Sequence, residues 1–373
     1  MNRIQQLHEL GQSVWCDNLG RGMIDSGELQ RLIDLGVAGV TSNPTIFMKA
    51  ITSGDDYDQR MTATDEKGLE VVGLYERLVL PDIADAADLL RPVYDRTDGG
   101  DGFVSLEVNP QLAFDPDATV EEAWRLFRHL NRPNILIKVP ATDQGLSAIE
   151  HLIGEGISVN VTLIFSVAMY RKVLDAYLKG LARLDHAGGD LSCVASVASF
   201  FVSRVDTAVD RLLSEKREAG AAVANLFGLA AVANAKIAYR RFQEVFDSSG
   251  PFARLAAKGA TVQRPLWAST STKNPAYPDT KYVDTLIGPN TVNTMPPETL
   301  AATLDHAQAV VTIDKDVDAA QVALARLAEC GVNLQAVTDR LTVEGVNAFA
   351  KSFDDLLSDL TRKRRHMAAA APV

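Results

Sequence analysis

The stretch NILIKVPATDQG, residues 134–145, has the pattern of a short buried strand bounded by Asn134 and Pro140. Inside it, Lys138 is flanked on both sides by apolar residues. A lysine is almost never fully buried unless it is paired or has a chemical task. Burial of an unpaired ammonium group either costs several kcal/mol or lowers its pKa correspondingly. The side chain of Lys138 therefore needs a partner or a role in chemistry.

Strand-like runs of this kind alternate with helical patterns along roughly the first 300 residues. Eight runs in β-α alternation predict a (β/α)8 TIM barrel. A doubly wound open sheet is the competing layout, but no G-x-G-x-x-G turn follows the first run and no Walker-type glycine loop is present. The eight runs are residues 13–19, 39–46, 102–110, 134–141, 156–165, 191–200, 260–270 and 291–296.

Helical patterns continue through residues 297–361, with no linker-like stretch before them. They predict the last barrel helix followed by C-terminal helical additions, and the periodic N-terminus predicts one more helix. We therefore expect a single barrel domain over residues 1–361. Residues 362–373 begin with a basic run and predict a flexible tail, although a binding patch stays open as an alternative.

Composition narrows the class of protein. The chain has 373 residues and a net charge of −11, which argues against a nucleic-acid surface. It contains neither an apolar run long enough for a membrane span nor a signal peptide. Three scattered cysteines do not form a disulfide framework. We expect a cytoplasmic protein in which an anionic substrate needs a local cluster of cations.

Polar side chains mark the C-terminal ends of most of the predicted strands. Alternation along the fourth strand points Lys138 inward near that end, where barrel enzymes hold their active sites. Several residues at the ends of the other runs would meet it there. These candidates are Asp17, Asn43, Glu107, Asn160, Thr162, Ser199, Phe201, Arg204, Ser271 and Lys273.

Each candidate also has a structural interpretation when it is taken alone. Asn43 precedes a proline and is a common turn former, and Thr162 is an ordinary strand residue. Arg204 begins a helix and also fits a surface ion pair. Asp17 also fits a helix cap, and Glu107 fits a structural salt bridge at the barrel rim.

The candidate residues favour the chemistry of an amine nucleophile beside carboxylates over a metal site or a serine nucleophile. The six histidines are scattered, so a histidine-rich metal site fits poorly, while Mg²⁺ on two rim carboxylates stays an alternative. No serine lies in a G-x-S-x-G elbow. A desolvated lysine can form a Schiff base with a carbonyl. The iminium then lets a neighbouring C–C bond break while a carboxylate takes the hydroxyl proton. This class I aldol chemistry needs no metal and no organic cofactor.

Six blocks of the sequence resemble those of the transaldolase family, in the family's order, and most closely those of its longer bacterial forms. The resemblance implies transfer of a dihydroxyacetone unit from sedoheptulose 7-phosphate to glyceraldehyde 3-phosphate. The products would be erythrose 4-phosphate and fructose 6-phosphate, in the non-oxidative pentose phosphate pathway. The blocks are VTSNPTIF (40–47), VSLEVNP (104–110), ILIKVPAT (135–142), ISVNVTLIFS (157–166), SVASFFVSRVD (196–206) and VQRPLWASTSTKNP (262–275).

The resemblance also implies catalytic roles. Lys138 is similar to the Schiff-base lysine of the family, and Asp17 to the acid/base that handles the C4 hydroxyl proton. Glu107 and Thr162 resemble the pair that positions the catalytic water.

The implied substrate contacts form a second group. Asn43 and Asn160 resemble amides that bind sugar hydroxyls, and Ser199 resembles a contact to the terminal hydroxyl. The phosphate site would consist of Arg204, Ser271 and Lys273, with Phe201 nearby. The shorter family members have arginine where this chain has Lys273, and lysine binds phosphate without a bidentate fork.

Two other functions remain open. A fructose 6-phosphate aldolase-like lyase uses the same scaffold, but those enzymes are shorter and carry glutamine and tyrosine where this chain has Glu107 and Phe201. A catalytically silent sugar-phosphate-binding barrel would be expected to have lost Lys138 or Asp17. We expect sugar phosphates as partners, and neither nucleic acid nor membranes. The sequence is compatible with a monomer and with a homodimer.

Overall fold

Eight parallel strands close into a barrel in the computed structural model, which describes residues 1–64 and 68–370. The strands follow one another around the barrel in chain order, which confirms the predicted (β/α)8 architecture. Each strand lies within its predicted run or extends one residue beyond it. The strands are β1 (Gln12–Cys16), β2 (Gly39–Thr41), β3 (Phe103–Glu107), β4 (Ile135–Pro140), β5 (Val159–Ile164), β6 (Ser196–Phe201), β7 (Arg264–Ala268) and β8 (Thr291–Met295).

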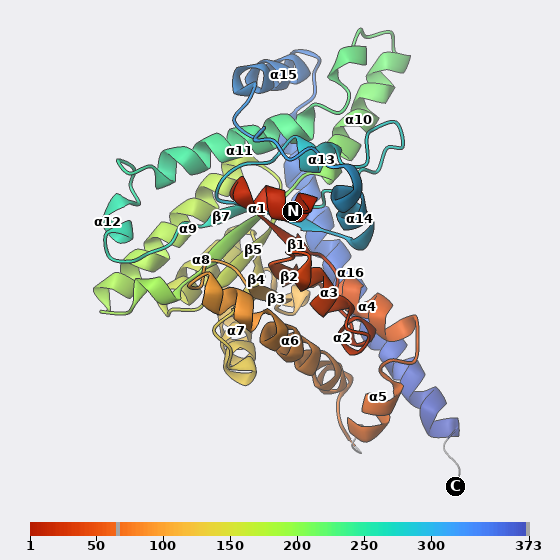
Figure 1. Cartoon of the computed structure of the whole chain (residues 1–373). Helices are drawn as coiled ribbons and strands as arrows, with labels where there is room; N and C mark the ends of the chain where they lie inside the picture. Colours follow the sequence, from red (N-terminus) through yellow and green to blue (C-terminus); the bar gives the residue numbers. More distant parts are fainter. Residues whose placement is uncertain (65–67, 371–373) are drawn as a thin grey trace.

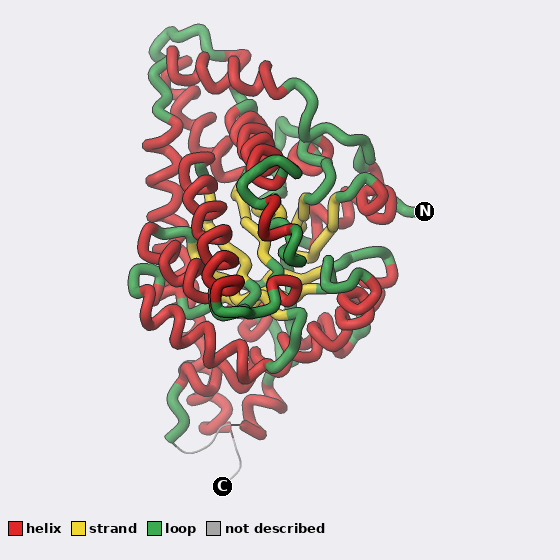
Figure 2. The backbone as a smooth tube through the Cα atoms, turned by 90° about the vertical axis from the view of Figure 1, so that its left-hand side faces the viewer, coloured by secondary structure: helices red, strands yellow, loops and turns green. Residues whose placement is uncertain are grey.

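Helices surround the strands, as Figures 1 and 2 show. The N-terminal half contains α1 (Arg3–Glu9), α2 (Arg21–Asp25), α3 (Glu28–Asp34), α4 (Pro44–Thr52), α5 (Asp58–Thr64), α6 (Val71–Arg96), α7 (Pro116–Leu130), α8 (Asp143–Gly154) and α9 (Val167–His186). The C-terminal half contains α10 (Ser203–Glu218), α11 (Ala230–Phe246), α12 (Ala253–Ala256), α13 (Lys281–Asp284), α14 (Pro297–His306), α15 (Val317–Glu329) and α16 (Leu334–Ala370).

Capping residues set where the helices begin after the strands. The side chain of Asn43 accepts a hydrogen bond from the Ile46 N–H at 3.1 Å and starts α4, with Pro44 in the first helical position. Thr142 does the same for α8, accepting from the Gly145 N–H at 2.8 Å. Such caps satisfy N–H groups that have no partner inside the helix. The proline also explains why β2 is shorter than the run predicted for it.

Polar groups fill the N-terminal end of the barrel. Trp15 donates its indole N–H to Asp101 at 2.7 Å, and Arg264 donates to Ser13 at 2.8 Å. Arg264 also lies 3.4 Å from the Asp101 carboxylate. These side chains form hydrogen bonds with one another and fill the N-terminal end of the barrel. A cavity can therefore form only at the opposite end.

The last helix, α16, runs beside α4 toward the C-terminus (Figure 1). Thr45 donates a hydrogen bond to Ser352 at 2.9 Å, and Lys363 donates to the Gly54 carbonyl at 2.9 Å. The helix includes residues 362–370 of the expected tail, and residues 371–373 lie outside the described residues. Although α16 is long, no helix in the described part of the chain is apolar enough to cross a membrane.

Gly102 provides a test of how α6 packs on the barrel. It has φ +84°, and an added Cβ would lie 2.3 Å from the Tyr94 nitrogen. We expect Gly102→Ala to destabilise the fold by about 2–5 kcal/mol, combining left-handed strain with overpacking. Gly27 has φ +73° with nothing near its Cβ position, so Gly27→Ala should lose only about 1–2 kcal/mol. Equal losses in denaturant unfolding would contradict this account.

Candidate active site

A cavity of about 330 Å³ opens at the C-terminal ends of the barrel strands. Most of the predicted site residues line it, and the other two, Glu107 and Asn160, contact residues that do. The strand ends therefore bring together residues that are far apart in the sequence. The predicted residues in the lining are Asp17, Asn43, Lys138, Thr162, Ser199, Phe201, Arg204, Ser271 and Lys273.

Lys138 is buried, with 5% of its surface exposed, and its ammonium group has two partners. Nζ donates a hydrogen bond to the Ser42 carbonyl at 3.1 Å and lies 3.2 Å from Glu107 Oε2. The ring of Phe349 faces the ammonium group at 5.5 Å from its centroid. These contacts explain how Lys138 can be buried, because they compensate its charge while the side chain stays in the cavity wall.

Glu107 owes its position to strand register. The Cα of Glu107 on β3 is paired with that of Lys138 on β4, so the two side chains point the same way. Burial raises the pKa of Glu107 above its ordinary value, while the charge of Lys138 opposes the rise. Glu107 is therefore a carboxyl group that can hold or release a proton beside the amine.

Asp17 follows β1 and is held by a neighbouring hydroxyl. Thr41 donates a hydrogen bond to Asp17 Oδ1 at 2.6 Å, and Thr41 is bonded in turn to Thr294 at 2.7 Å. The alternative of a helix cap does not hold, because the cap position of α2 is occupied by Gly20. The carboxylate of Asp17 is thus oriented into the cavity by strand residues.

Asn160 connects three strands beneath the cavity. Its side-chain nitrogen donates to Ser105 at 3.0 Å, and its oxygen accepts from Ser199 at 2.7 Å. Asn160 is also paired by register with Lys138. The amide therefore fixes the Ser199 hydroxyl at the floor of the cavity.

Thr162 lies at an irregularity of β5. The register between β5 and β6 shifts after Val161, and Leu163 has φ +61°. Such a bulge re-aims the neighbouring side chains. The Thr162 hydroxyl is buried at the cavity wall and has no hydrogen-bond partner within the described residues. It is therefore available to a water molecule or a ligand.

Cations collect on the β6–β7 side of the cavity. Arg204 packs over the Phe201 ring at 5.2 Å, and Lys273 donates a hydrogen bond to Ser271 at 2.6 Å. Burial lowers the pKa of Arg204, an effect that the charge of Asp17 opposes. Neither cation forms an ion pair with a carboxylate in residues 1–64 and 68–370.

The alternative of a surface ion pair for Arg204 does not hold. The nearest acidic candidate in the sequence, Asp206, instead binds Lys281 at 3.1 Å and accepts from the Tyr282 hydroxyl at 2.8 Å. Arg204 thus keeps its donors for an anion in the cavity.

The sequence analysis did not name ten residues of the lining, and three of them show which signals were missed. Thr41 lies at the end of β2, so the same strand-end signal that selected Asp17 would have found it. Lys49 lies on α4 and extends the set of cations at the opposite wall. Phe349 comes from α16, and no local pattern brings it to the barrel mouth. No group of three or more metal-ligating side chains occurs among the residues that the structure describes.

The fold and this site define a (β/α)8-barrel enzyme with a lysine–carboxylate centre. Comparison with known proteins gives the family. The family model described as "Transaldolase/Fructose-6-phosphate aldolase" matches residues 14–360, so the chain belongs to this family.

Relatives match over nearly their whole lengths. The chain is 49% identical to "Transaldolase" of Thermobifida fusca, over 96% of this chain and 98% of that protein. It is 47% identical to "Transaldolase 2" of Streptomyces coelicolor, over 98% of each. It is 44% identical to "Transaldolase 2" of Nostoc sp., over 97% of this chain and 98% of that protein.

The buried ion pair predicts a pH-dependent stability change. Lys138→Met would leave the Glu107 carboxyl buried without its partner, at a loss of about 3–5 kcal/mol near neutral pH. The folded-state pKa of Glu107 is raised above 4.5, so protonation favours the folded state. The loss should therefore shrink as the pH falls toward 4.5 and grow as it rises through the raised pKa.

Unfolding by denaturant across this pH range measures the effect. The double variant Lys138→Met/Glu107→Gln, which has no unpaired charge, should recover much of the stability at neutral pH. A loss that does not vary with pH, or no recovery in the double variant, would contradict the role assigned to the pair.

Proposed function

We propose that this chain is a transaldolase that transfers a dihydroxyacetone unit from sedoheptulose 7-phosphate to glyceraldehyde 3-phosphate. The products are erythrose 4-phosphate and fructose 6-phosphate, and the pathway is the non-oxidative pentose phosphate pathway. The observation that carries the proposal is the Lys138 amine, 3.2 Å from Glu107, in the wall of a cavity that Asp17 also lines. Membership of the family and the names of the relatives support it.

The first step forms a Schiff base. Glu107 accepts the proton that the Lys138 ammonium loses, and the free amine attacks the ketone carbon of the donor sugar. The unpaired Thr162 hydroxyl and Glu107 together hold the water through which the departing hydroxyl is protonated. The protonated hydroxyl leaves as a water molecule and gives the iminium, which supplies the electron sink, so the scheme uses no metal and no organic cofactor.

The second step breaks the C3–C4 bond. Asp17, oriented by Thr41, takes the proton of the C4 hydroxyl while the bonding electrons pass to the iminium. The aldehyde leaves and the dihydroxyacetone unit stays on Lys138 as an enamine. Attack of this enamine on the acceptor aldehyde reverses the step, and hydrolysis releases the product.

Polar groups orient the sugar during both steps. Asn43 and Asn160 bind hydroxyls, and Ser199, fixed by its hydrogen bond to Asn160, binds the terminal hydroxyl. Arg204 and Lys273, together with Ser271, bind the phosphate. An acidic chain attracts an anionic ester only where cations converge, which supports this placement.

Two residues favour transfer over simple cleavage. Glu107 and Phe201 stand where the aldolase-type members differ; Glu107 contacts Lys138, and Phe201 lines the cavity. The proposal includes a cytoplasmic location and one functional domain over residues 1–361. A shared hydrophobic core that extends from Ile4 to Leu360 supports the single domain.

A coupled assay with fructose 6-phosphate tests the function. Glyceraldehyde 3-phosphate should form rapidly only when erythrose 4-phosphate is present as acceptor, because the enamine otherwise stays on the enzyme. Lys138→Ala should abolish the reaction while remaining folded. Equal rates with and without acceptor would assign the chain to cleavage, and no reaction at all would assign it to binding.

Borohydride should trap the intermediate on Lys138. Incubation with fructose 6-phosphate and reductant should add the mass of a reduced dihydroxyacetone unit to the peptide that contains this residue. Lys236, which is also buried but far along the chain, serves as the control lysine. A label on any lysine other than Lys138 would contradict the assignment.

Arg204→Ala should impair phosphorylated substrates selectively. Loss of a charged hydrogen bond costs about 1.5–3 kcal/mol, roughly ten- to a hundredfold in kcat/KM. The slow reaction with free dihydroxyacetone as donor and an unphosphorylated aldehyde as acceptor should barely change. Arg211→Ala, on the exposed face of α10, is the matched control. Equal impairment of both reactions would make Arg204 structural.

A further inference from the structure

One of the two proposed phosphate cations, Lys273, lies on the segment 269–282 that follows β7. Lys273 and the next three residues are exposed to solvent. Lys273 lines the active-site cavity and also a second cavity of about 160 Å³. A side chain between two cavities gains little support from packing, and ordering an exposed stretch costs conformational entropy. Contacts elsewhere in the segment must therefore hold Lys273 at the active site.

The start of the segment is bonded to the first turn of α10. The Ser203 N–H donates to the Ser269 carbonyl at 3.0 Å, and the hydroxyls of the two serines lie 2.9 Å apart. Ser269 has φ +56°, a left-handed conformation that is uncommon for residues other than glycine. The residue that follows Ser203 on α10 is Arg204, the other proposed phosphate cation. The contacts with Ser203 thus hold a strained turn of the segment next to Arg204.

The end of the segment is bonded to the same helix, further along α10. Asp210 accepts a hydrogen bond from the Tyr277 hydroxyl at 2.5 Å, and Asp206 accepts one from the Tyr282 hydroxyl at 2.8 Å. The ammonium group of Lys281 lies 3.1 Å from Asp206. Because Asp206 and Asp210 are four residues apart, they lie on one face of α10. Three side chains of the segment therefore bind a single helix face.

A tight turn connects Tyr277 to Lys273. The Tyr277 N–H donates to the Asn274 carbonyl at 3.0 Å, and the Ala276 N–H donates to the Asn274 side chain at 3.0 Å. A turn that an asparagine side chain closes in this way is well defined. The anchored ring of Tyr277 therefore sets the position of Asn274 and of Lys273 immediately before it. The Lys273 ammonium group in turn donates to Ser271 at 2.6 Å.

The two aspartates do not compete with a phosphate group for the cations. Asp206 has Lys281 as its ion-pair partner, and Asp210 accepts from two neutral donors, a hydroxyl and a backbone N–H. In the part of the chain that the structure describes, neither aspartate forms an ion pair with Arg204 or Lys273. The network can thus hold the segment in place and leave both cations to a ligand.

We propose that Asp206 and Asp210 are positioning residues for the phosphate site, which anchor the segment 269–282 to the helix that carries Arg204. The inference rests on the proposed function. With these anchor contacts in place, Arg204 and Lys273 keep a constant separation, and both can donate to one phosphate group. A cation that the substrate must first order loses part of its binding free energy to that ordering. The two aspartates therefore determine how strongly the site prefers a phosphorylated sugar.

The ratio of two acceptor reactions measures this preference. With dihydroxyacetone as the donor, transfer to glyceraldehyde 3-phosphate gives fructose 6-phosphate, and transfer to glyceraldehyde gives fructose. The two acceptors differ only in the phosphate group. The ratio of their kcat/KM values therefore cancels any general effect of a variant on the chemistry or on the folded fraction. The parent enzyme should favour the phosphorylated acceptor.

Four variants weaken the anchor contacts to different degrees. Asp210→Ala removes the acceptor of Tyr277 and should lower the ratio about tenfold, mainly through a higher KM for the phosphorylated acceptor. Tyr277→Phe and Tyr282→Phe each lose one hydrogen bond and should lower the ratio about threefold. Asp210→Asn should stay within about twofold of the parent, because its amide can accept from the Gly228 N–H and donate to the Tyr277 oxygen.

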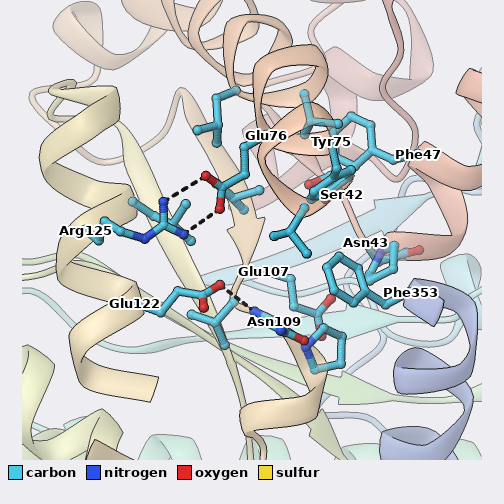
Figure 3. A pocket seen from close by; sticks show the side chains of 18 residues that line it. Ser42, Asn43, Phe47, Tyr75, Glu76, Glu107, Asn109, Glu122, Arg125 and Phe353 are labelled. Carbon is cyan, nitrogen blue, oxygen red and sulfur yellow. Dashed lines mark hydrogen bonds and ion pairs between the residues drawn. The ribbon is translucent and has the colours of Figure 1, made fainter. Parts of the chain in front are cut away.

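Glu122→Ala is the matched control. Like Asp210, Glu122 is half-buried on a helix and accepts from a loop N–H at 2.9 Å, here that of Asn109 (Figure 3). Asn109 follows the strand of Glu107 and does not precede a phosphate cation. This variant can slow the chemistry, but it should change the two acceptor reactions by the same factor and leave the ratio unchanged.

A double variant tests whether Asp210 acts through Lys273. Lys273→Met alone should lower the ratio roughly ten- to a hundredfold. Adding Asp210→Ala should lower it little further, because the cation that the anchor contacts position is already absent. A second loss as large as that of Asp210→Ala alone would contradict the proposal.

Other results would also overturn the positioning role. An unchanged ratio in Tyr277→Phe and Asp210→Ala would exclude it, and equal losses with both acceptors would make the aspartate structural. Both results require an active parent enzyme, which separates them from failure of the proposed function. A parent that transfers no dihydroxyacetone unit would refute that function. An active parent without preference for the phosphorylated acceptor would refute the phosphate site and its positioning residues together.

Discussion

The 3.2 Å contact between the Lys138 ammonium and the Glu107 carboxylate is the constraint around which the site is built. Parallel register places the two residues side by side on β3 and β4, so barrel closure forces both charges into the wall. Neither can be removed alone without leaving the other buried and unpaired. The carboxylate that compensates the buried ammonium is also the proton acceptor in the proposed mechanism.

Near this pair, two cations of the cavity wall have no carboxylate partner. The chain has a net charge of −11, yet Arg204 and Lys273 have no carboxylate partner in the described residues. Asp206, two positions beyond Arg204, is occupied by Lys281 and Tyr282. An arginine left with free donors in a half-buried cavity wall has lost hydration without replacement, which supports the proposed phosphate site.

The strands and most of the site could be predicted from the sequence because both depend on short-range patterns. Period-two alternation and β-α succession located the barrel, and a polar residue at a strand end marked Asp17, Glu107 and Lys138. Phe349 could not be found this way. It lies on a helix, where its burial depends on packing between elements, and an isolated helical pattern does not indicate which cavity a side chain faces.

The path of α16 has a consequence for how the protein is made. Phe349 belongs to the last helix, yet it lines the cavity that contains Lys138. Because α16 follows all eight strands in the chain, the barrel can close before the helix that adds Phe349 to the wall around Lys138 has been made. The surroundings of the amine are therefore complete only once α16 has packed on the barrel.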